Sequence, residues 1–544
     1  MKPLSLLAFT GATLAATGYG LGRKGSLRTQ SNRPLALDVD PSTLYPAHNL
    51  SVPIDHFHNE SIYEPHSNSS FPLRYWFDAS HYKKGGPVFI LESGEASGEE
   101  RIPFLQKGLI AQLAQETNGI AVVLEHRYYG TSIPTPDLST ESLRFLTTEQ
   151  ALADVAYFSE HIKFPGLEDQ SITAHDVPYI AYGGSYAGAF VAFLRVVYPN
   201  LFFGAISSSG VTEAIIDYWQ YFEPIRHHAP QDCVRTNLQF TQLIDNLLPQ
   251  SSEFERFKAL FGLQDLSYAN DFASVLSEPL GAWQSRNWDP AVDDPTFFAF
   301  CGNITSNNLI YNGTASKASE AKKLIAAAGY KNESAQLTTR LLNFVGWLNE
   351  TIIWPCLGEG ETADSCFSTH NVTYYQQDDI SQDWRLWDYQ VCTEWGFYQT
   401  GSGTPKDELP MISRSIDIDY LSLSCKYAFN ITTPPDIQRV NKYGGFDIDY
   451  TRLAIIGGQA DPWREATPLA DGASPRKNTN DRPFVEIAGA VHHWDENGLF
   501  PNETTPTLPP APVASAQKFE HAFIKEWLKE WKMHASATQQ TTFN

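Results

Sequence analysis

Apolar positions in the first part of the chain fall into short runs that predict a buried parallel sheet. Residues 87–91 (Pro-Val-Phe-Ile-Leu) and 120–124 (Ile-Ala-Val-Val-Leu) are uninterrupted apolar runs of strand length, as expected for strands covered on both faces. Further predicted strands alternate with stretches of helical spacing: strands at 177–182 and 203–207, helices at 104–117, 149–164 and 186–198. This alternation predicts an α/β, doubly wound architecture.

The middle of the chain has a different pattern. Residues 212–441 lose the alternation, are rich in helical spacing, tryptophan and loop residues, and contain all six cysteines. Strand-like runs return at 453–456 and 484–487. An α/β domain interrupted by a helical insertion explains this order better than three independent domains do.

The two ends complete the predicted domain order. A lysine, an apolar run and small residues make 1–20 typical of a secretory signal peptide, and 21–48 is expected to be a leader or linker. Near the other end, six apolar residues at helical spacing predict an amphipathic helix on the sheet: Phe519, Phe523, Ile524, Trp527, Leu528 and Trp531. The domains are then 49–211 and 442–533 for the two α/β parts, 212–441 for the helical insertion, and 534–544 for a flexible tail.

Composition narrows the classes of function. The 544 residues include 62 acidic and 39 basic side chains, which gives a formal net charge of −23. Nucleic-acid binding requires clustered Lys and Arg, and since the sequence has no such cluster after the leader, we expect no nucleic-acid partner. No later stretch reaches the roughly 18 uninterrupted apolar residues of a membrane helix, so we expect no membrane span.

Sequons and cysteines agree with export from the cytosol. Ten Asn-x-Ser/Thr sequons are candidate glycosylation sites, of which chance alone would give several. They are Asn49, Asn59, Asn68, Asn303, Asn312, Asn332, Asn349, Asn371, Asn430 and Asn502. We expect the protein to be secreted or extracellular, with a vacuolar or lysosomal location as the alternative.

The six cysteines predict up to three disulfides in an oxidising compartment, because none has the Cys-x-x-Cys spacing of a zinc or redox site. The alternative is six buried free thiols. Pairing of nearest neighbours, one of many connectivities, would join Cys233 with Cys301, Cys356 with Cys366, and Cys392 with Cys425.

The stretch from Ala181 to Gly188, Ala-Tyr-Gly-Gly-Ser-Tyr-Ala-Gly, lies between a predicted strand and a predicted helix. A serine at a sharp strand-to-helix turn among small residues is a nucleophile elbow, which makes Ser185 the candidate nucleophile. The strict Gly-x-Ser-x-Gly form is not met, because Ala187 fills its last position. The alternative is a turn shaped by two glycines, with Ser185 only capping the helix.

Two later strand ends supply the acid and the base that a nucleophilic serine needs. Asp461 follows the strand at 453–456, and His492 and His493 follow the strand at 484–487, in the expected order of serine, acid and histidine. The alternatives are an Asp-Pro turn and, for the histidines, a surface pair or a weak metal site. Adjacent histidines do not easily share one tetrahedral ion and no other ligands accompany them, so we expect no metal and no cofactor.

Several stretches, in this order, resemble the family of serine peptidases that includes lysosomal Pro-X carboxypeptidase, dipeptidyl-peptidase II, thymus-specific serine peptidase and fungal prolyl endopeptidases. They are Asp55-His56-Phe57, Arg74-Tyr75-Trp76, 125–132 (Glu-His-Arg-Tyr-Tyr-Gly-Thr-Ser), 146–154 (Leu-Thr-Thr-Glu-Gln-Ala-Leu-Ala-Asp), the elbow, and Asp461-Pro462-Trp463. The resemblance covers about residues 50–530 and is most specific at 125–130 and the elbow. It implies an α/β-hydrolase fold with a large inserted helical cap domain, and peptide cleavage after proline.

Carried over by position, the resemblance implies Ser185 as the nucleophile and Asp461 as the acid. The family's histidine motif, Gly-x-x-His followed by His or Cys and an Asp two residues later, matches Gly489, His492, His493 and Asp495 and favours His492 over His493 as the base. Departures from the family in the continuation Trp494-Asp495-Glu496 keep His493 as the alternative.

The other site residues are expected around the nucleophile. The oxyanion hole should use the backbone N–H of Tyr186 and one from the loop after the strand at 87–91, where Gly94 or Glu95 is the candidate; alternatively, Gly94 only shapes that loop. The resemblance implies an aromatic slot for the proline ring, to which Trp463 is expected to contribute. We interpret the run 125–127 (Glu-His-Arg) as a structural Arg–carboxylate network under the sheet rather than as a catalytic cluster.

These observations predict a serine peptidase that cleaves peptide or protein substrates on the carboxyl side of proline through an acyl-enzyme. The alternatives are an esterase or lipase, and a non-catalytic hydrolase-like binding protein; the retained serine, acid and histidine favour the enzyme. Endo, carboxy and dipeptidyl modes stay open, with a slight lean to a secreted endopeptidase or carboxypeptidase. Four acidic residues are candidates to bind a substrate's terminal amine, or are simply solvated: Glu92, Glu95, Glu99 and Glu100. The sequence does not distinguish a monomer from a homodimer.

Overall fold

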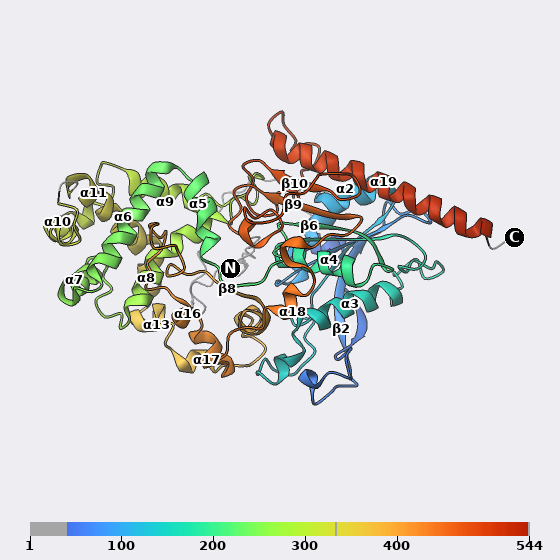
Figure 1. The fold of residues 1–544 in the computed structure, drawn as a ribbon, viewed down its shortest axis with the longest axis horizontal. Coiled ribbons are helices and arrows are strands. Elements are labelled where there is room, and N and C mark those ends of the chain that lie inside the picture. Colours follow the sequence, from blue (N-terminus) through green and yellow to red (C-terminus); the bar gives the residue numbers. More distant parts are fainter. Residues whose placement is uncertain (1–40, 332–333, 542–544) are drawn as a thin grey trace, which may run out of the picture.

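The structure of the chain is a computed structural model that describes residues 41–331 and 334–541. The predicted signal peptide, most of the predicted linker and Asn332 lie outside these ranges. A sheet covered by helices forms one part of the molecule, and a lobe of helices lies beside it (Figure 1).

An eight-stranded sheet, in the order β1-β2-β4-β3-β5-β6-β9-β10, forms the centre of the α/β part. Its strands are β1 (His48–Pro53), β2 (Ser70–Asp78), β3 (Val88–Glu92), β4 (Ile120–Leu124), β5 (Tyr179–Gly184), β6 (Phe202–Ser208), β9 (Leu453–Gly458) and β10 (Phe484–Ile487). The pairs β1–β2 and β2–β4 are antiparallel, and all pairs from β4 to β10 are parallel. The chain therefore has an α/β-hydrolase fold, with a mostly parallel sheet interrupted in sequence between β6 and β9.

Two hydrophobic cores lie on opposite faces of this sheet because successive strand side chains point to opposite sides. Val88 and Ile90 of β3 belong to one core and Phe89 and Leu91 to the other. The first core includes side chains of α3 (Thr148–His161) and α4 (Tyr186–Val197), and the second includes those of α2 (Leu109–Thr117) and α19 (Ala511–Thr541).

Helix α19 is the amphipathic helix expected near the end of the chain. Phe523, Ile524 and Trp527 are buried in the second core. The helix continues to Thr541, past the point at 534 where we expected a flexible tail, and the sequence from 513 to 541 has no Gly or Pro to stop it.

Between β6 and β9 the chain is mainly helical. The first helices of this region are α5 (Glu223–His228), α6 (Gln231–Leu247), α7 (Ser251–Phe261), α8 (Ala269–Ser277), α9 (Thr296–Thr305), α10 (Ala318–Ala327) and α11 (Ser334–Leu348). Shorter helices follow: α12 (Trp354–Leu357), α13 (Ala363–Phe367), α14 (Val372–Tyr375), α15 (Trp384–Gln390), α16 (Ile418–Leu421), α17 (Leu423–Phe429) and α18 (Gln438–Asn441); α1 (Pro41–Leu44) precedes the sheet. A small parallel pair of strands, β7 (Ile215–Asp217) and β8 (Gly396–Tyr398), was not expected from the sequence.

Three disulfides lie within this helical insertion. Cys233–Cys301 joins α6 to α9, Cys356–Cys366 joins α12 to α13, and Cys392–Cys425 joins the π-helical turn Val391–Trp395 to α17. These are the pairs that nearest-neighbour pairing predicted.

Two surface features complete the fold. Within 41–331 and 334–541, no helix is both long enough and apolar enough to cross a membrane. Each sequon asparagine in those ranges is at least partly exposed, as a glycan acceptor must be.

Candidate active site

Ser185 lies at the sharp turn between β5 and α4. Its backbone has φ 61° and ψ −125°, a conformation that is costly for any residue with a Cβ. The turn is held by the Ser185 N–H, which donates to the Ser208 carbonyl at the end of β6 (2.9 Å). The residue is 8% exposed. These are the features of an elbow that presents a nucleophile at the end of a strand.

The small residues of the elbow are required by close backbone approach. A Cβ on Gly183 would lie 2.2 Å from the Ala187 carbonyl oxygen, and one on Gly188 would lie 2.6 Å from the Ser208 carbonyl oxygen. The close contact with β6 therefore falls on position 188, which explains why Ala is accepted at 187 despite the departure from the strict motif.

Asp461 and His492 form a buried pair at the ends of β9 and β10. The His492 Nδ1 lies 2.9 and 3.0 Å from the two carboxylate oxygens of Asp461, and the Trp463 N–H also donates to that carboxylate (2.9 Å). The two residues are 1% and 4% exposed. His492 Nε2 is buried and has no hydrogen-bond partner among the described residues. A carboxylate on Nδ1 leaves Nε2 as the basic nitrogen.

The surroundings favour the neutral imidazole and the ionised carboxylate. Burial alone would raise the pKa of Asp461, but the His492 ring and the hydrogen bonds to the carboxylate hold it below its usual value. Burial lowers the pKa of His492 against the opposing attraction of Asp461. The imidazole therefore stays a base at lower pH than an ordinary histidine does.

His493 has different partners. Its N–H donates to Ser209 Oγ (3.0 Å), and its Nδ1 lies 2.8 Å from a carboxylate oxygen of Glu496. A Cβ on Gly184 would lie 2.9 Å from its ring, so this histidine packs on the elbow. The structure thus brings His492, and not His493, to Asp461.

Asp495 anchors the loop that carries both histidines. It is fully buried and accepts hydrogen bonds from Tyr182 Oη (2.8 Å) and Ser208 Oγ. Glu520 of α19 is also fully buried, and burial together with the charge of Asp495 raises its pKa well above the usual value. The sequence did not single out Tyr182, Ser208 or Glu520, because nothing local relates them to the histidines.

The loop after β3 lies against the elbow. A Cβ on Gly94 would lie 3.4 Å from the Ala187 Cβ. The Gly94 N–H already donates to Glu92 Oε2 (2.7 Å). Of the two N–H groups that we considered as oxyanion donors in this loop, Glu95 is therefore the better candidate. Tyr186 is the first residue of α4, so its N–H has no partner within that helix.

The four acidic residues of this loop have different surroundings. Glu92 is 2% exposed, its Oε1 has no hydrogen-bond partner in the described part of the chain, and burial raises its pKa to about 8. Burial also raises the pKa of Glu95, which is half-buried. Glu99 is bound to Arg74 (2.6 Å), and Glu100 is exposed.

Trp463 lies in an aromatic cluster. Its ring stacks on Tyr218 (5.3 Å between centroids) and meets Tyr221 and Phe397 edge-on (5.4 and 5.0 Å), while its Nε1–H donates to Gln284 Oε1 (2.8 Å). All four partners come from the helical insertion. Sequence reasoning missed them, although the richness of the insertion in aromatic residues was visible.

The run Glu125-His126-Arg127 forms a buried network. Arg74 donates to both oxygens of Glu125 (2.6 and 3.0 Å), and Arg127 donates to both oxygens of Asp154 (2.6 and 2.7 Å). These pairs connect β2, the loop after β4 and α3, which agrees with the structural interpretation.

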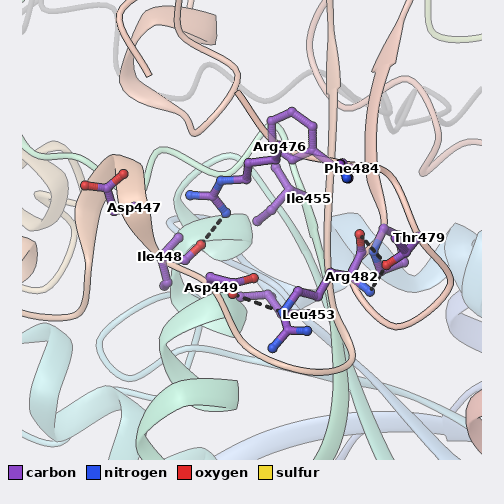
Figure 2. Close-up of a pocket in the computed structure, with 11 residues that line it drawn as sticks. Asp447, Ile448, Asp449, Leu453, Ile455, Arg476, Thr479, Arg482 and Phe484 are labelled. Carbon is purple, nitrogen blue, oxygen red and sulfur yellow. Dashed lines mark hydrogen bonds and ion pairs between the residues drawn. The ribbon is translucent and has the colours of Figure 1, made fainter. Parts of the chain in front are cut away.

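A separate pocket lies near the beginnings of β9 and β10. Its lining includes Leu453 and Ile455 of β9, Phe484 of β10, and the charged residues Arg476 and Arg482 (Figure 2). The cavity volume is about 330 Å³. The candidate catalytic residues follow the opposite, carboxyl ends of these strands, so this pocket is not part of their site.

The parallel strands end in an elbow serine and a carboxylate–imidazole pair. This fold and these side chains are those of a serine hydrolase of the α/β-hydrolase class. The chain belongs to the serine carboxypeptidase S28 family, whose model matches residues 52–274 and 311–507, and it is a serine-type peptidase.

Two relatives illustrate this membership. The chain is 55% identical over 509 residues to a probable extracellular serine carboxypeptidase of Arthroderma benhamiae, covering 92% of this chain and 71% of that protein. It is 26% identical over 551 residues to lysosomal Pro-X carboxypeptidase of Pongo abelii, covering 97% of each. The solved structure of a proline iminopeptidase from Mycobacterium smegmatis matches 88% of this chain and 98% of its own with 12% identity and a TM-score of 0.33.

Proposed function

We propose that this protein is a secreted carboxypeptidase that cleaves peptides after a proline, with Ser185 as nucleophile, His492 as general base and Asp461 as the group that orients the imidazole. The proposal rests on the contact of both Asp461 oxygens with His492 Nδ1. The strained elbow serine follows strand β5 of the same parallel sheet. The contact of Asp461 with His492 fixes the tautomer in which Nε2 accepts a proton.

The proposed reaction has two stages. His492 Nε2 takes the Ser185 Oγ proton as that oxygen attacks the carbonyl carbon, and the N–H groups of Tyr186 and Glu95 bind the developing oxyanion. His492 then gives the proton to the leaving amine, which leaves an acyl-enzyme on Ser185. Water, activated by the same imidazole, releases the acid product.

The aromatic cluster around Trp463 supports a preference for proline. Proline offers a compact ring without an N–H, which an apolar aromatic wall binds by packing. Trp463 is two residues from Asp461, and its ring is fixed by Tyr218 and Gln284. The name of the Pongo abelii relative specifies a Pro-X substrate and supports the same preference.

A carboxypeptidase also needs a cation near its site to bind the terminal carboxylate. Arg101 is the candidate, since its charge acts on Glu92, Glu95 and Glu496 and its Nε–H reaches the Ser93 carbonyl (3.4 Å). The carboxypeptidase name of the Arthroderma benhamiae relative supports this mode, and its description as extracellular supports secretion. Three disulfides also suit an oxidising compartment.

A pair of histidine variants and a peptide set test the proposal. Ser185→Ala and His492→Ala should each lower turnover by roughly 10⁴- to 10⁶-fold, whereas His493→Ala should be milder. Mass spectrometry should show release of the last residue from peptides with a penultimate proline, and little release when alanine replaces proline or the end is amidated. Arg101→Gln should raise KM for the free acid only.

Each arm has a result that contradicts one part of the proposal. Undiminished turnover by a folded Ser185→Ala variant would exclude this nucleophile, and a greater loss in His493→Ala would move the base to His493. Equal cleavage of the alanine peptide would exclude the proline preference, and equal cleavage of the amidated peptide would exclude the carboxypeptidase mode.

A further inference from the structure

The loop between β1 and β2 brings three metal-type ligands together at the edge of the sheet opposite β9 and β10. They are Asp55, His58 and His66, and one carboxylate oxygen and two imidazole nitrogens all lie within 4.8 Å of one another. Over the described ranges of the chain, no other group of three His, Cys, Asp or Glu side chains was found that could hold an ion. No local pattern marks this cluster in the sequence, because a twelve-residue span with irregular spacing matches no standard ligand motif.

We propose that Asp55, His58 and His66 bind one divalent transition-metal ion, with Zn²⁺ the best match. Two imidazoles and a carboxylate are a typical three-residue zinc set, with the fourth tetrahedral position taken by water. Nitrogen ligands favour Zn²⁺, Cu²⁺ or Ni²⁺ over Ca²⁺ and Mg²⁺, which prefer oxygen.

The spacing of the ligands suits such an ion. Ligand atoms about 2.0–2.1 Å from a tetrahedral Zn²⁺ are roughly 3.4 Å apart. In the structure, Asp55 Oδ2 and His66 Nδ1 are 2.8 Å apart, and no ligand pair exceeds 4.8 Å. These separations lie on both sides of the required value, so small rotations of the exposed His58 and the partly exposed His66 side chains bring the three atoms to it.

The buried member of the site is already oriented. Asp55 is almost fully buried, and its Oδ1 accepts hydrogen bonds from the Phe57 N–H (2.9 Å) and from Gln150 Nε2 of α3 (2.9 Å). Its Oδ2 points to His66. Partners that fix one carboxylate oxygen and leave the other for the ion are typical of metal sites.

His58 is the residue that distinguishes a metal site from a purely structural contact between Asp55 and His66. The Asp55–His66 contact exists without it, while His58 is exposed and its ring lies 5.5 Å from that of His66. Loss of His58 should therefore leave the loop intact and remove only a ligand. The loop is already held to α3, since Gln150 binds Asp55 and Asp154 binds His56 (2.8 Å).

The test is calorimetric titration of ZnCl₂ into the untagged, full-length secreted protein after chelator treatment and dialysis. We expect one Zn²⁺ per chain in the wild type and binding weakened at least about tenfold in His58→Ala, since loss even of a supporting partner costs 10- to 100-fold. His175→Ala is the matched control, because His175 is an exposed histidine paired with a single carboxylate, Glu160 (3.1 Å). It should bind like the wild type.

Co²⁺ gives a second measurement that does not depend on affinity alone. The wild type should show the intense visible absorption of tetrahedral Co²⁺, and His58→Ala should not. Absence of stoichiometric Zn²⁺ binding, or equal binding and spectra in wild type and His58→Ala, would overturn the proposal. Neither result would affect the peptidase assignment, because the catalytic candidates lie elsewhere.

Discussion

Glu92 is a buried titratable residue at the start of the loop proposed to bind the oxyanion. It is buried, one of its oxygens binds the Gly94 N–H, and burial raises its pKa to about 8. At neutral pH the side chain is protonated and carries no charge. Above that pKa it becomes a buried negative charge beside the place where the transition state develops its own negative charge.

We therefore predict that kcat/KM falls as pH rises through about 8 and that Glu92→Gln moves this alkaline limit to higher pH. A raised pKa in the folded state also means that the contribution of Glu92 to the free energy of unfolding declines between about pH 4.3 and its folded pKa, so the variant should flatten that decline. Profiles of kcat/KM and of denaturant stability against pH measure both effects.

Glu99→Gln is the control, because Glu99 is exposed on the same loop and paired with Arg74. It should leave the alkaline limit in place. An unchanged limit in Glu92→Gln would mean that another group controls it.

Among the elements, the segment from the short 3₁₀ helix η5 (Glu278–Trp283) to Trp288 holds the loops of both the acid and the base. Trp283 Nε1–H donates to the Ala460 carbonyl (2.8 Å), next to Asp461, and Trp288 Nε1–H donates to the Trp494 carbonyl (2.7 Å), two residues after His492. The segment falls between the two matched parts of the family model, 52–274 and 311–507. Both hydrogen bonds therefore come from a segment that the family model does not cover.

We predict that Trp288→Phe, which keeps an aromatic ring but removes the N–H, lowers kcat by about 5- to 30-fold with a smaller change in KM. Loss of one buried hydrogen bond costs about 1–2 kcal/mol, and here it loosens the His492 loop rather than the substrate pocket. Steady-state kinetics and the rate of fluorophosphonate labelling measure the effect.

Trp384→Phe is the matched control, since the Trp384 indole N–H donates to the nearby Gln382 (3.0 Å) within the insertion. It should retain wild-type kcat. A loss in Trp288→Phe that appears in thermal stability and not in kcat would limit the segment to a structural role.

The disulfides stabilise the helical insertion. The contribution of each one to the free energy of unfolding depends on the length of chain that it closes. Cys233–Cys301 spans 68 residues and Cys356–Cys366 spans 10. The chain-entropy relation gives about 4 kcal/mol for the longer loop and about 3 kcal/mol for the shorter one. We predict that replacing both cysteines of the first pair by serine lowers the free energy of unfolding more than the same change in the second pair does. Guanidinium unfolding of the two variants measures the order, and a reversed order would contradict it.

Local patterns predicted the parallel strands and the residues that follow them. Ser185, Asp461 and His492 each follow an apolar run within a few residues, so the sequence places them at one end of the sheet. The predicted strand at 177–182 begins only at Tyr179, after Pro178, whose backbone has no N–H for the ladder.

Contacts between distant parts of the chain had no such local signal. The antiparallel strands β1 and β2 are only partly buried, and their mixed pattern gives no continuous apolar run. The pair β7–β8 joins residues 215–217 to 396–398, a separation that no local period encodes. The partners of Trp463 and of Asp495 were missed for the same reason.

The sheet order also determines when neighbouring strands become available to pair during translation. Strand β6 pairs with β9, yet the whole helical insertion is translated between them, which at roughly 5–20 residues per second takes roughly 10–50 s. During that interval the candidate nucleophile has been translated and the candidate acid and base have not, and the edge of β6 is open to incorrect strand pairing. We therefore expect the nascent chain to have no peptidase activity until β9 and β10 have been made.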